Sequence, residues 1–339
     1  MIRTLLLLAL LTLPSLATAG AANGGYPQRE EVRQFVREMA GKHGFKKREL
    51  NALFGRARFQ TAIIRAMTLP PDSSPRAWQA YRALFVDPLH VDGGVRFSLR
   101  HAETLARAAR EFGIPPEIIV AIVGVETVYG RNMGGYRVFD ALTTLAFDYP
   151  RRAEFFRGEL ENYLLYVRDA GIDALTIRGS YAGAIGIPQF MPGSYLRYAL
   201  DYDGDGRRDL SASAADAIGS VANFLKEHGW DAGAPIAVPA RVDGDAHRLL
   251  IDAGIKPLYR VADLALFGVS GAESLSPETL CALIELETPG QPSEYRIALQ
   301  NFYVLTRYNR SSFYASAVIE LARAIADAQA QSAAEAAPR

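Results

Sequence analysis

Glu126 stands alone at the far end of an almost uniformly apolar segment, residues 115–130 (PPEIIVAIVGVETVYG). Prolines begin the segment, which suits a helix because the first helical turn leaves its N–H groups unpaired. A helix without a polar face is buried, and burial and the negative end of the helix dipole both raise the pKa of a carboxyl group. A glutamic acid that stays protonated near neutral pH is the general acid that glycosidic bond cleavage requires. Two other interpretations stay open: a buried strand for the segment, and an ion pair between Glu126 and Arg131.

The sequence after Glu126 is rich in tyrosine and glycine. Nine of the sixteen tyrosines lie between Tyr129 and Tyr202. Tyrosine offers a flat apolar face and a hydroxyl group, which suit sugar rings and their polar edges. Four glycines between residues 179 and 193 allow the backbone to approach a ligand closely. These residues favour a saccharide cleft, although ordinary packing explains a tyrosine cluster equally well.

An alternating acidic run, residues 201–209 (DYDGDGRRD), is the second chemical signal. Its aspartates, with Gly206 at the sixth position, match an EF-hand calcium loop, in which carboxylates surround one hard cation. The twelfth position holds Ala212 instead of the usual glutamate. We expect a structural Ca²⁺ or Na⁺ here, and a solvated acidic turn that caps the next helix is the alternative. The expected ligands are Asp201, Asp203, Asp205, the carbonyl group of Arg207, and Asp209.

Composition narrows the classes of function. The 339 residues include 37 basic and 37 acidic side chains, and this balance disfavours a dedicated nucleic-acid-binding protein. The single cysteine, Cys281, can form no intrachain disulfide and no cysteine-rich zinc site, so we expect it to be buried. The five histidines show no metal-ligand spacing. No cofactor is therefore expected for catalysis.

Residues 1–20 (MIRTLLLLALLTLPSLATAG) have the form of a cleaved secretory signal. Arg3 precedes an apolar run too short to span a bilayer, and residues 17–19 resemble a cleavage site. No cysteine follows the run that could carry a lipid, and no later stretch is long and apolar enough to cross a membrane. We therefore expect a soluble protein of the periplasm, without a membrane anchor.

Hydrophobic periodicity predicts a mainly α-helical chain. A helical stretch over 30–65 should break at 41–44, and the segment 179–195 should be an ordered loop or broken helices. Short β-type runs predict a small strand-containing insertion at 232–297. Ser311 is the expected N-cap of the last helix, and the tail 331–339 is expected to be disordered. Further helices are expected at 95–112, 115–130, 151–170, 214–230, 297–309 and 311–330.

Several motifs together resemble the lytic murein transglycosylase B family, glycoside hydrolase family 103. They run in the family's order between residues 75 and 318 and include GVETVYGRNMGGYRVFDALTTLAFDYPRRAEFF, SYAGAIGIPQFMPGSYLRYALDYDGDG, DAIGSVANFLKEHGW and LTRYNRSSFYA. The resemblance implies a mainly α fold, a lysozyme-like helical core with an N-terminal helical domain and a small inserted antiparallel β domain. The implied domains are 21–85 joined by the helix 311–330, a catalytic core at 86–231 and 298–310, and the insertion 232–297.

The resemblance also implies an activity. This is the non-hydrolytic cleavage of the β-1,4 bond between N-acetylmuramic acid and N-acetylglucosamine in peptidoglycan, which leaves a 1,6-anhydromuramoyl end. The family's catalytic glutamate falls on Glu126, and Asp216 closes the acidic loop 201–216, where this chain carries one extra residue. The implied substrate-binding residues are Tyr81, Arg151 and Arg152 near the stem peptide, Ser180, Tyr181, Gln189, Tyr308 and Asn309.

A single acid suffices if the substrate supplies its own nucleophile, the C6 hydroxyl group of the muramoyl sugar. A lysozyme-type hydrolase needs a second carboxylate, for which Asp140, Asp148 and Glu154 are candidates in more polar stretches. Two alternatives therefore stay open, such a hydrolase and an inactive peptidoglycan-binding scaffold. The expected partners are glycan strands, stem peptides and other cell-wall enzymes, and the chain is expected to be a monomer.

Overall fold

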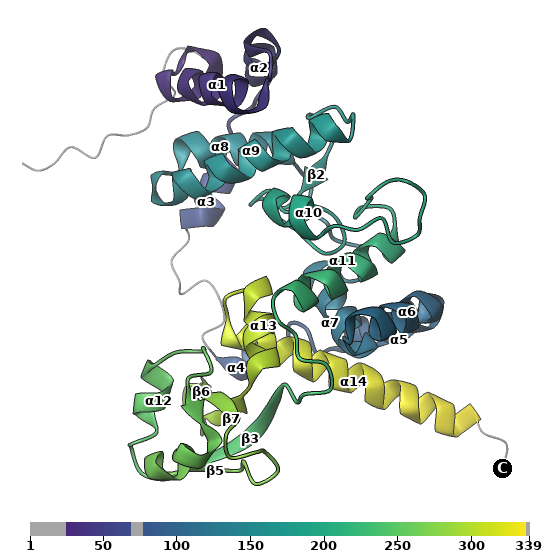
Figure 1. Ribbon diagram of the computed structural model, residues 1–339, viewed down its shortest axis with the longest axis vertical. Coiled ribbons are helices and arrows are strands. Elements are labelled where there is room, and N and C mark those ends of the chain that lie inside the picture. Colours follow the sequence, from purple (N-terminus) through teal and green to yellow (C-terminus); the bar gives the residue numbers. More distant parts are fainter. Residues whose placement is uncertain (1–24, 69–76, 337–339) are drawn as a thin grey trace, which may run out of the picture. The chain divides into compact units, whose positions relative to one another are not determined.

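The computed structural model describes residues 25–68 and 77–336 (Figure 1). The predicted secretory signal, residues 1–20, lies outside these residues. The chain forms two compact units, of which the first ends at Arg58 and the second begins at Phe59. No helix in the described ranges is long and apolar enough to cross a membrane.

The first unit is a small helical one. Its elements are the 3-10 helix η1 (Tyr26–Gln28) and the helices α1 (Glu30–His43) and α2 (Lys47–Phe54). Phe35 of α1 meets Phe54 of α2 edge to face, with ring centroids 6.0 Å apart. Helix α1 ends at Gly44, whose left-handed φ of 70° is accessible to glycine without strain. The predicted break at 41–44 is therefore confirmed.

The second unit is mainly helical, and four of its helices contact α7 (Pro116–Thr127). Every residue from Ile118 to Gly124 is buried, because these side chains are apolar on all faces of the helix. The predicted buried helix is confirmed, and the alternative of a strand is wrong. The other helices are α3 (Thr61–Thr68), α4 (Trp78–Arg82), α5 (Pro88–Arg100), α6 (Ala102–Phe112), α8 (Val138–Asp148), η3 (Pro150–Arg152), α9 (Ala153–Asp169), α10 (Pro192–Tyr198), α11 (Ala214–Glu227), α12 (Arg248–Asp252), η4 (Val261–Phe267), α13 (Gln300–Tyr308) and α14 (Ser312–Ala336).

A short antiparallel ribbon follows α7. Strand β1 (Tyr136–Arg137) pairs with β2 (Arg178–Gly179), with Tyr136 opposite Gly179. A Cβ atom at Gly134 would lie 2.2 Å from the carbonyl oxygen of Gly179, so only glycine lets these two backbones meet. After β2 the chain runs irregularly to α10, as predicted for 179–195.

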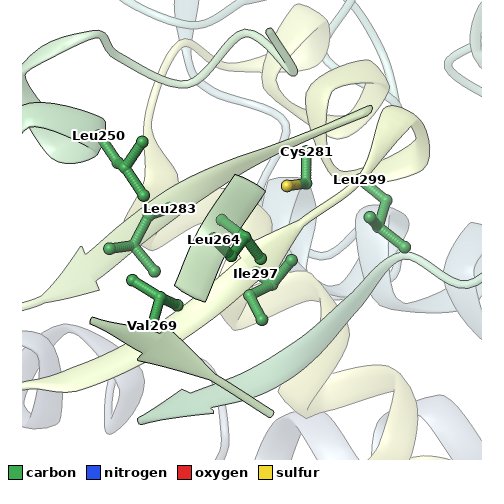
Figure 2. Close-up of a cluster of buried hydrophobic side chains, with 7 residues drawn as sticks. All are labelled: Leu250, Leu264, Val269, Cys281, Leu283, Ile297 and Leu299. Atoms are coloured by element: carbon green, nitrogen blue, oxygen red, sulfur yellow. The ribbon is translucent and has the colours of Figure 1, made fainter. Parts of the chain in front are cut away.

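Five strands form an antiparallel sheet in the order β4-β6-β7-β3-β5. The strands are β3 (Ala237–Val242), β4 (Tyr259–Arg260), β5 (Val269–Ser270), β6 (Leu280–Leu286) and β7 (Glu294–Ala298). Figure 2 shows the buried apolar cluster of this region, which includes Leu283 of β6, Ile297 of β7 and Cys281. Cys281 is fully buried, as expected, and burial raises the pKa of its thiol to about 11.

The chain enters and leaves the sheet region beside one buried side chain, Asn301 of α13. Its Oδ1 accepts a hydrogen bond of 2.8 Å from the N–H of Asp231, and its Nδ2 donates to the carbonyl groups of Asp231 and Ala234 at 2.8 and 3.0 Å. The N–H of Leu299 donates to the carbonyl group of Ile236 at 3.0 Å. These hydrogen bonds join the two ends of the sheet region.

The fold class is the predicted one, a helical body with a small antiparallel sheet. Ser311 caps α14 as predicted, because its Oγ accepts the N–H of Tyr314 at 3.3 Å. The expected disorder of the tail 331–339 is wrong for residues 331–336: α14 continues to Ala336, since its alanine- and glutamine-rich end has high helix propensity. Residues 337–339 lie outside the described residues. The domain boundaries stay predictions; helix α14, which they join to residues 21–85, contacts α4 of that range and also α5 and α7.

Candidate active site

Glu126 lies in the last turn of α7, and its side chain is half-buried. Its Oε1 accepts a hydrogen bond of 2.7 Å from the hydroxyl group of Tyr314 on α14. Burial raises the pKa of Glu126 to about 7, and the hydrogen bond from Tyr314 opposes this rise. No second carboxylate of the described chain contributes to the shift. A large share of molecules therefore carries a protonated Glu126 near neutral pH, as a general acid must.

Two candidates for a second acid are unsuited to that role. Arg137 donates to both oxygens of Asp140 at 2.7 and 2.9 Å, so this buried carboxyl group belongs to an ion pair. Glu154 is exposed on α9. Among the described residues, Arg131 forms no ion pair with Glu126 either. The alternative of an ion pair between these two residues is therefore not supported.

The backbone that follows Glu126 is strained. Val128 and Tyr129 adopt left-handed φ values of 51° and 61°, which cost free energy for residues that have a side chain. The Oγ1 of Thr127 donates to the carbonyl group of Ile187 at 2.8 Å and accepts the N–H of Gly130 at 2.9 Å. These hydrogen bonds fix the end of α7, and with it Glu126, against the segment 179–195.

The ring of Tyr129 fills a slot lined by three glycines. A Cβ atom at Gly93 or Gly94 of α5, or at Gly124 of α7, would lie 2.6 to 2.7 Å from this ring or its hydroxyl group. The hydroxyl group donates to the carbonyl group of His90 at 2.7 Å. The glycines thus admit the aromatic ring that holds the left-handed turn in place.

We expect Gly124→Ala to lower the free energy of unfolding by about 2 kcal/mol, because the new methyl group collides with the fixed ring of Tyr129. The displaced ring would shift the left-handed turn at Val128 and Tyr129, which follows Glu126, so kcat should fall as well. Urea unfolding and turnover measure the two effects. Gly158→Ala on α9 is the matched control, since a Cβ atom there meets nothing within 4 Å and alanine favours helix. Wild-type stability in Gly124→Ala would show that the slot does not constrain Tyr129.

Three tyrosines from separate segments gather near Glu126. The rings of Tyr308 and Tyr314 stack with centroids 6.3 Å apart, and the hydroxyl group of Tyr308 donates to the carbonyl group of Pro188 at 2.6 Å. Burial raises the pKa values of Tyr81, Tyr308 and Tyr314, and the charge of Glu126 raises them further. The structure therefore brings the predicted Tyr81 and Tyr308 to the acid.

Sequence reasoning missed Tyr314 as a site residue. It lies in the motif LTRYNRSSFYA, six residues after Tyr308, and this position is the signal that could have identified it. Its side chain is 1% exposed, and Glu126 is the acceptor of its hydroxyl group. Tyr314 therefore positions the acid and lowers its proton affinity.

We expect Tyr314→Phe to lower kcat about tenfold, because Glu126 loses a hydrogen bond that stabilises its charged form. The same loss should raise the pKa of Glu126, so the alkaline limb of the kcat profile should move to higher pH. Turnover measured between pH 5 and 9 tests both effects. Tyr303→Phe, on α13 and not among the groups that shift Glu126, is the control. An unchanged alkaline limb in Tyr314→Phe would contradict this role.

Ser180 and Tyr181 lie in the segment after β2. The Oγ of Ser180 accepts the N–H groups of Ala182 and Ala184 at 3.3 and 3.0 Å, which leaves its own proton available to a ligand. Tyr181 is 46% exposed, a high value for an aromatic side chain. Both residues are therefore accessible, as substrate-binding residues must be.

Gln189 has a left-handed φ of 53°, which its side chain helps to hold. Its Nε2 donates to the carbonyl groups of Met133 and Gly186 at 3.2 and 2.8 Å. These two bonds orient the side-chain amide and join the segment 179–195 to the residues that precede β1.

Three other predicted residues are exposed. Asn309 follows the last residue of α13, and Arg151 and Arg152 lie in η3. The guanidinium group of Arg152 lies over the ring of Phe155, 4.3 Å from its centroid. Within the described part of the chain, no hydrogen bond joins these three side chains to Glu126, so their roles stay predictions.

Three carboxylates of the acidic loop converge. Oxygen atoms of Asp201, Asp203 and Asp205 lie within 4.8 Å of one another, and all three residues are exposed. Asp201 accepts backbone N–H groups of the loop, including that of Gly206 at 2.8 Å, so its carboxylate is already oriented. Oxygen donors of this kind suit a hard cation such as Ca²⁺.

The side chains of Asp209 and Asp216 accept hydrogen bonds from the backbone and do not join this group of three. Asp209 accepts the N–H groups of Ser211 and Ala212, each at 2.9 Å. Asp216 is 1% exposed, and its oxygens accept the N–H groups of Tyr202 and Asp209, each at 2.7 Å. The structure therefore does not bring Asp209 and Asp216 into the group of three, and the ligand roles of these two and of the Arg207 carbonyl stay predictions.

The chain is similar to several known proteins. It is 43% identical over 316 residues to membrane-bound lytic murein transglycosylase B of Escherichia coli (strain K12), a match that covers 91% of this chain and 86% of that protein. The structure of the E. coli lytic transglycosylase Slt35 in complex with calcium has a TM-score of 0.80 at 41% identity, covering 91% of this chain and 95% of that one. SltB3 from Pseudomonas aeruginosa, in complexes with NAG-NAM-pentapeptide and NAG-anhNAM-pentapeptide, has a TM-score of 0.76 at 32% identity, covering 88% and 79%.

A protein-family model described as the transglycosylase SLT domain matches residues 27–323. This match and the identity to the E. coli relative confirm the resemblance to the lytic murein transglycosylase B family. The chain therefore belongs to the family of transglycosylases with an SLT domain.

Proposed function

We propose that this chain is an exported lytic transglycosylase that cleaves the β-1,4 bond between N-acetylmuramic acid and N-acetylglucosamine in peptidoglycan and leaves 1,6-anhydromuramoyl ends. One observation carries the proposal: Glu126 is a desolvated acid with a pKa of about 7, and no second carboxylate of residues 25–68 and 77–336 contributes to its shift. Hydrolases of the usual kind use two carboxylates. The complex of the relative SltB3 with NAG-anhNAM-pentapeptide supports an anhydro product.

Glu126 acts twice in this reaction. Its proton passes to the glycosidic oxygen as the bond to N-acetylglucosamine breaks, and the 2-acetamido group of the muramoyl sugar stabilises the positive centre. The carboxylate, which accepts the hydroxyl group of Tyr314, then takes the proton of the C6 hydroxyl group while O6 bonds to C1. The acid ends the cycle protonated, and no water is consumed.

The groups around the acid bind the substrate and keep water away. The tyrosine rings near Glu126 desolvate it, which slows competing hydrolysis. The hydroxyl group of Ser180 and the amide oxygen of Gln189 are available to sugar hydroxyl groups. The exposed guanidinium groups of Arg151 and Arg152 suit the carboxylates of stem peptides. Tyr81, Tyr181, Tyr308 and Asn309 complete the proposed cleft.

Digestion of purified sacculi with this protein tests the function through the masses of the released products. A transglycosylase releases anhydromuropeptides that are lighter by one water than the products of a lysozyme-type hydrolase. Mass spectrometry of the digest therefore separates the two reactions. Hydrated products would overturn the proposal in favour of a hydrolase, and the absence of any product, with binding to sacculi intact, would favour a scaffold.

The acidic loop is proposed to hold a structural Ca²⁺, or Na⁺, which orders the loop and takes no part in the reaction. Asp201, Asp203 and Asp205 supply the converging oxygens. The complex of the relative Slt35 with calcium supports this assignment. The proposed cellular site is the periplasm, on the form of residues 1–20, and we propose a monomer that meets glycan strands, stem peptides and other cell-wall enzymes.

We expect a chelator to lower the Tm of the calcium-saturated protein by about 5 °C. A bound ion whose free concentration is about a hundred times Kd stabilises the folded chain by about 2.7 kcal/mol, and the chelator removes this stabilisation. Turnover at low temperature should change much less, since Glu126 does not depend on the ion. Differential scanning calorimetry and a turnover assay measure the two effects. Asp201→Asn should abolish the response of Tm to chelator. A Tm that calcium and chelator both leave unchanged would rule out the ion.

A further inference from the structure

A cavity of about 880 Å³ lies apart from Glu126, which is not among its lining residues. Its walls are the C-terminal end of α9 with the turn that follows, strand β2, and the second half of the acidic loop. The volume is within the range of ligand-binding pockets. The catalytic proposal uses none of the side chains of these three walls.

The cationic side chains of this cavity are available for a ligand. Arg178, Arg207 and Arg208 line it, and all three are exposed. Arg178 donates through Nη1 to the carbonyl group of Gly135 at 2.7 Å, which orients its guanidinium group and leaves other N–H groups unused. No described side chain pairs with the guanidinium group of Arg207 or Arg208. Three guanidinium groups around one cavity suit carboxylates, which they can bind through paired hydrogen bonds.

The cavity also has two acidic side chains. Asp169 accepts the Nε–H of Arg168 at 3.0 Å, and Asp209 accepts two backbone N–H groups through Oδ1. Both carboxylates keep oxygens that could accept a hydrogen bond from an ammonium group. The mixed lining therefore favours a ligand that carries several carboxylates and an amino group over a simple polyanion.

The cavity shares a wall with the proposed glycan cleft. Met133 and Gly134 line it, and Gln189 donates to the carbonyl group of Met133 at 3.2 Å. Gly134 packs against the backbone of Gly179, the residue before Ser180. A ligand in the cavity would therefore lie next to the segment that carries Ser180 and Gln189.

We propose that this cavity binds an acidic peptide with a free amino group, the chemistry of a peptidoglycan stem peptide. The inference rests on the proposed function, because that function brings a glycan strand with its peptides to the adjoining segment. Arg178 and Arg208 bind the carboxylates, and Asp169, which is not an expected ion ligand, binds the amino group. The enzyme would thus hold a peptide at a second place, distinct from Arg151 and Arg152 of η3.

Calorimetric titration tests the proposal on the full chain that carries Glu126→Gln, Arg151→Gln and Arg152→Gln, with calcium held constant, so that the peptide does not bind at η3. The probe is the free tetrapeptide L-Ala-γ-D-Glu-meso-diaminopimelate-D-Ala. Adding Arg178→Gln with Arg208→Gln should weaken its binding about tenfold or more, because two charge-assisted contacts are lost. Arg100→Gln with Arg110→Gln, two exposed arginines of α5 and α6, is the matched control and should leave the affinity unchanged. The same peptide with amidated carboxyl groups should bind weakly to every variant.

Equal affinity for the tetrapeptide in the cavity variant and the control variant would overturn the proposal. So would full competition by inorganic phosphate, which would identify a general anion site. Product masses from peptide-free glycan chains, measured on the wild-type chain, test the proposed function separately. Anhydro products together with unchanged peptide affinity would reject the cavity alone, whereas hydrated products together with the tenfold loss would reject the function alone.

Discussion

Glu126→Gln should abolish the release of anhydromuropeptides, with kcat lowered about a thousandfold or more. Glutamine has nearly the same shape and can still accept the hydrogen bond from Tyr314, but its amide group is not acidic enough to protonate the glycosidic oxygen. Binding to sacculi should persist, because the surrounding side chains are unchanged. Release of soluble muropeptides, followed by chromatography, measures the loss.

Glu117→Gln is the matched control for this experiment. Glu117 is the acid at the other end of the same helix, α7, and it is half-buried like Glu126. The same chemical change there should leave turnover unchanged. Substantial turnover in Glu126→Gln, with products of the same mass as those of the wild type, would show that another group supplies the proton.

The free energy of unfolding should fall by about 2 to 3 kcal/mol between pH 4.5 and pH 8 because of Glu126 alone. Its folded pKa of about 7 lies above the ordinary value of 4.5, so the folded chain holds the proton more tightly than the unfolded chain. This contribution to stability is fully present below pH 4.5 and is lost as the pH rises through 7. The partial exposure of the side chain keeps the effect below the full value of the shift.

Urea unfolding of the wild type and Glu126→Gln at pH 5 and pH 8 isolates this effect. Relative to wild type, the variant should gain stability between the two pH values, since glutamine does not ionise. The Glu117→Gln variant corrects for the general effect of removing an acid from α7. A stability difference between wild type and Glu126→Gln that does not change with pH would mean that Glu126 has an ordinary pKa. The acid thus lowers stability under the conditions in which it works.

Local sequence signals predicted most of the elements that position the site. The apolar run that follows Pro116 predicts α7, Ser311 predicts the start of α14, and the glycine at 44 ends α1. Each of these signals acts over a few residues, through burial, a capping hydrogen bond or an accessible left-handed φ. The motifs then placed Glu126 at the end of its helix.

Contacts between distant segments could not be predicted in the same way. Tyr314 and Glu126 are 188 residues apart, and their hydrogen bond depends on how α14 packs against α7. The slot around Tyr129 depends on two helices whose glycines look unrelated in the sequence. The inward position of Asp216 follows from its backbone hydrogen bonds, which a ligand pattern does not encode. Tertiary packing decides each of these features.

The hydrogen bonds at Asn301 make the sheet region a closed loop on the helical body. The entropy cost of closing a loop rises only with the logarithm of its length, so doubling the length costs about 0.6 kcal/mol. Changes of length at exposed turns of this region, such as the turn that contains Gly254 after α12, should therefore be tolerated. Differences in length between related chains should concentrate at such turns, while the distance between the side chains of Glu126 and Tyr314 stays constant.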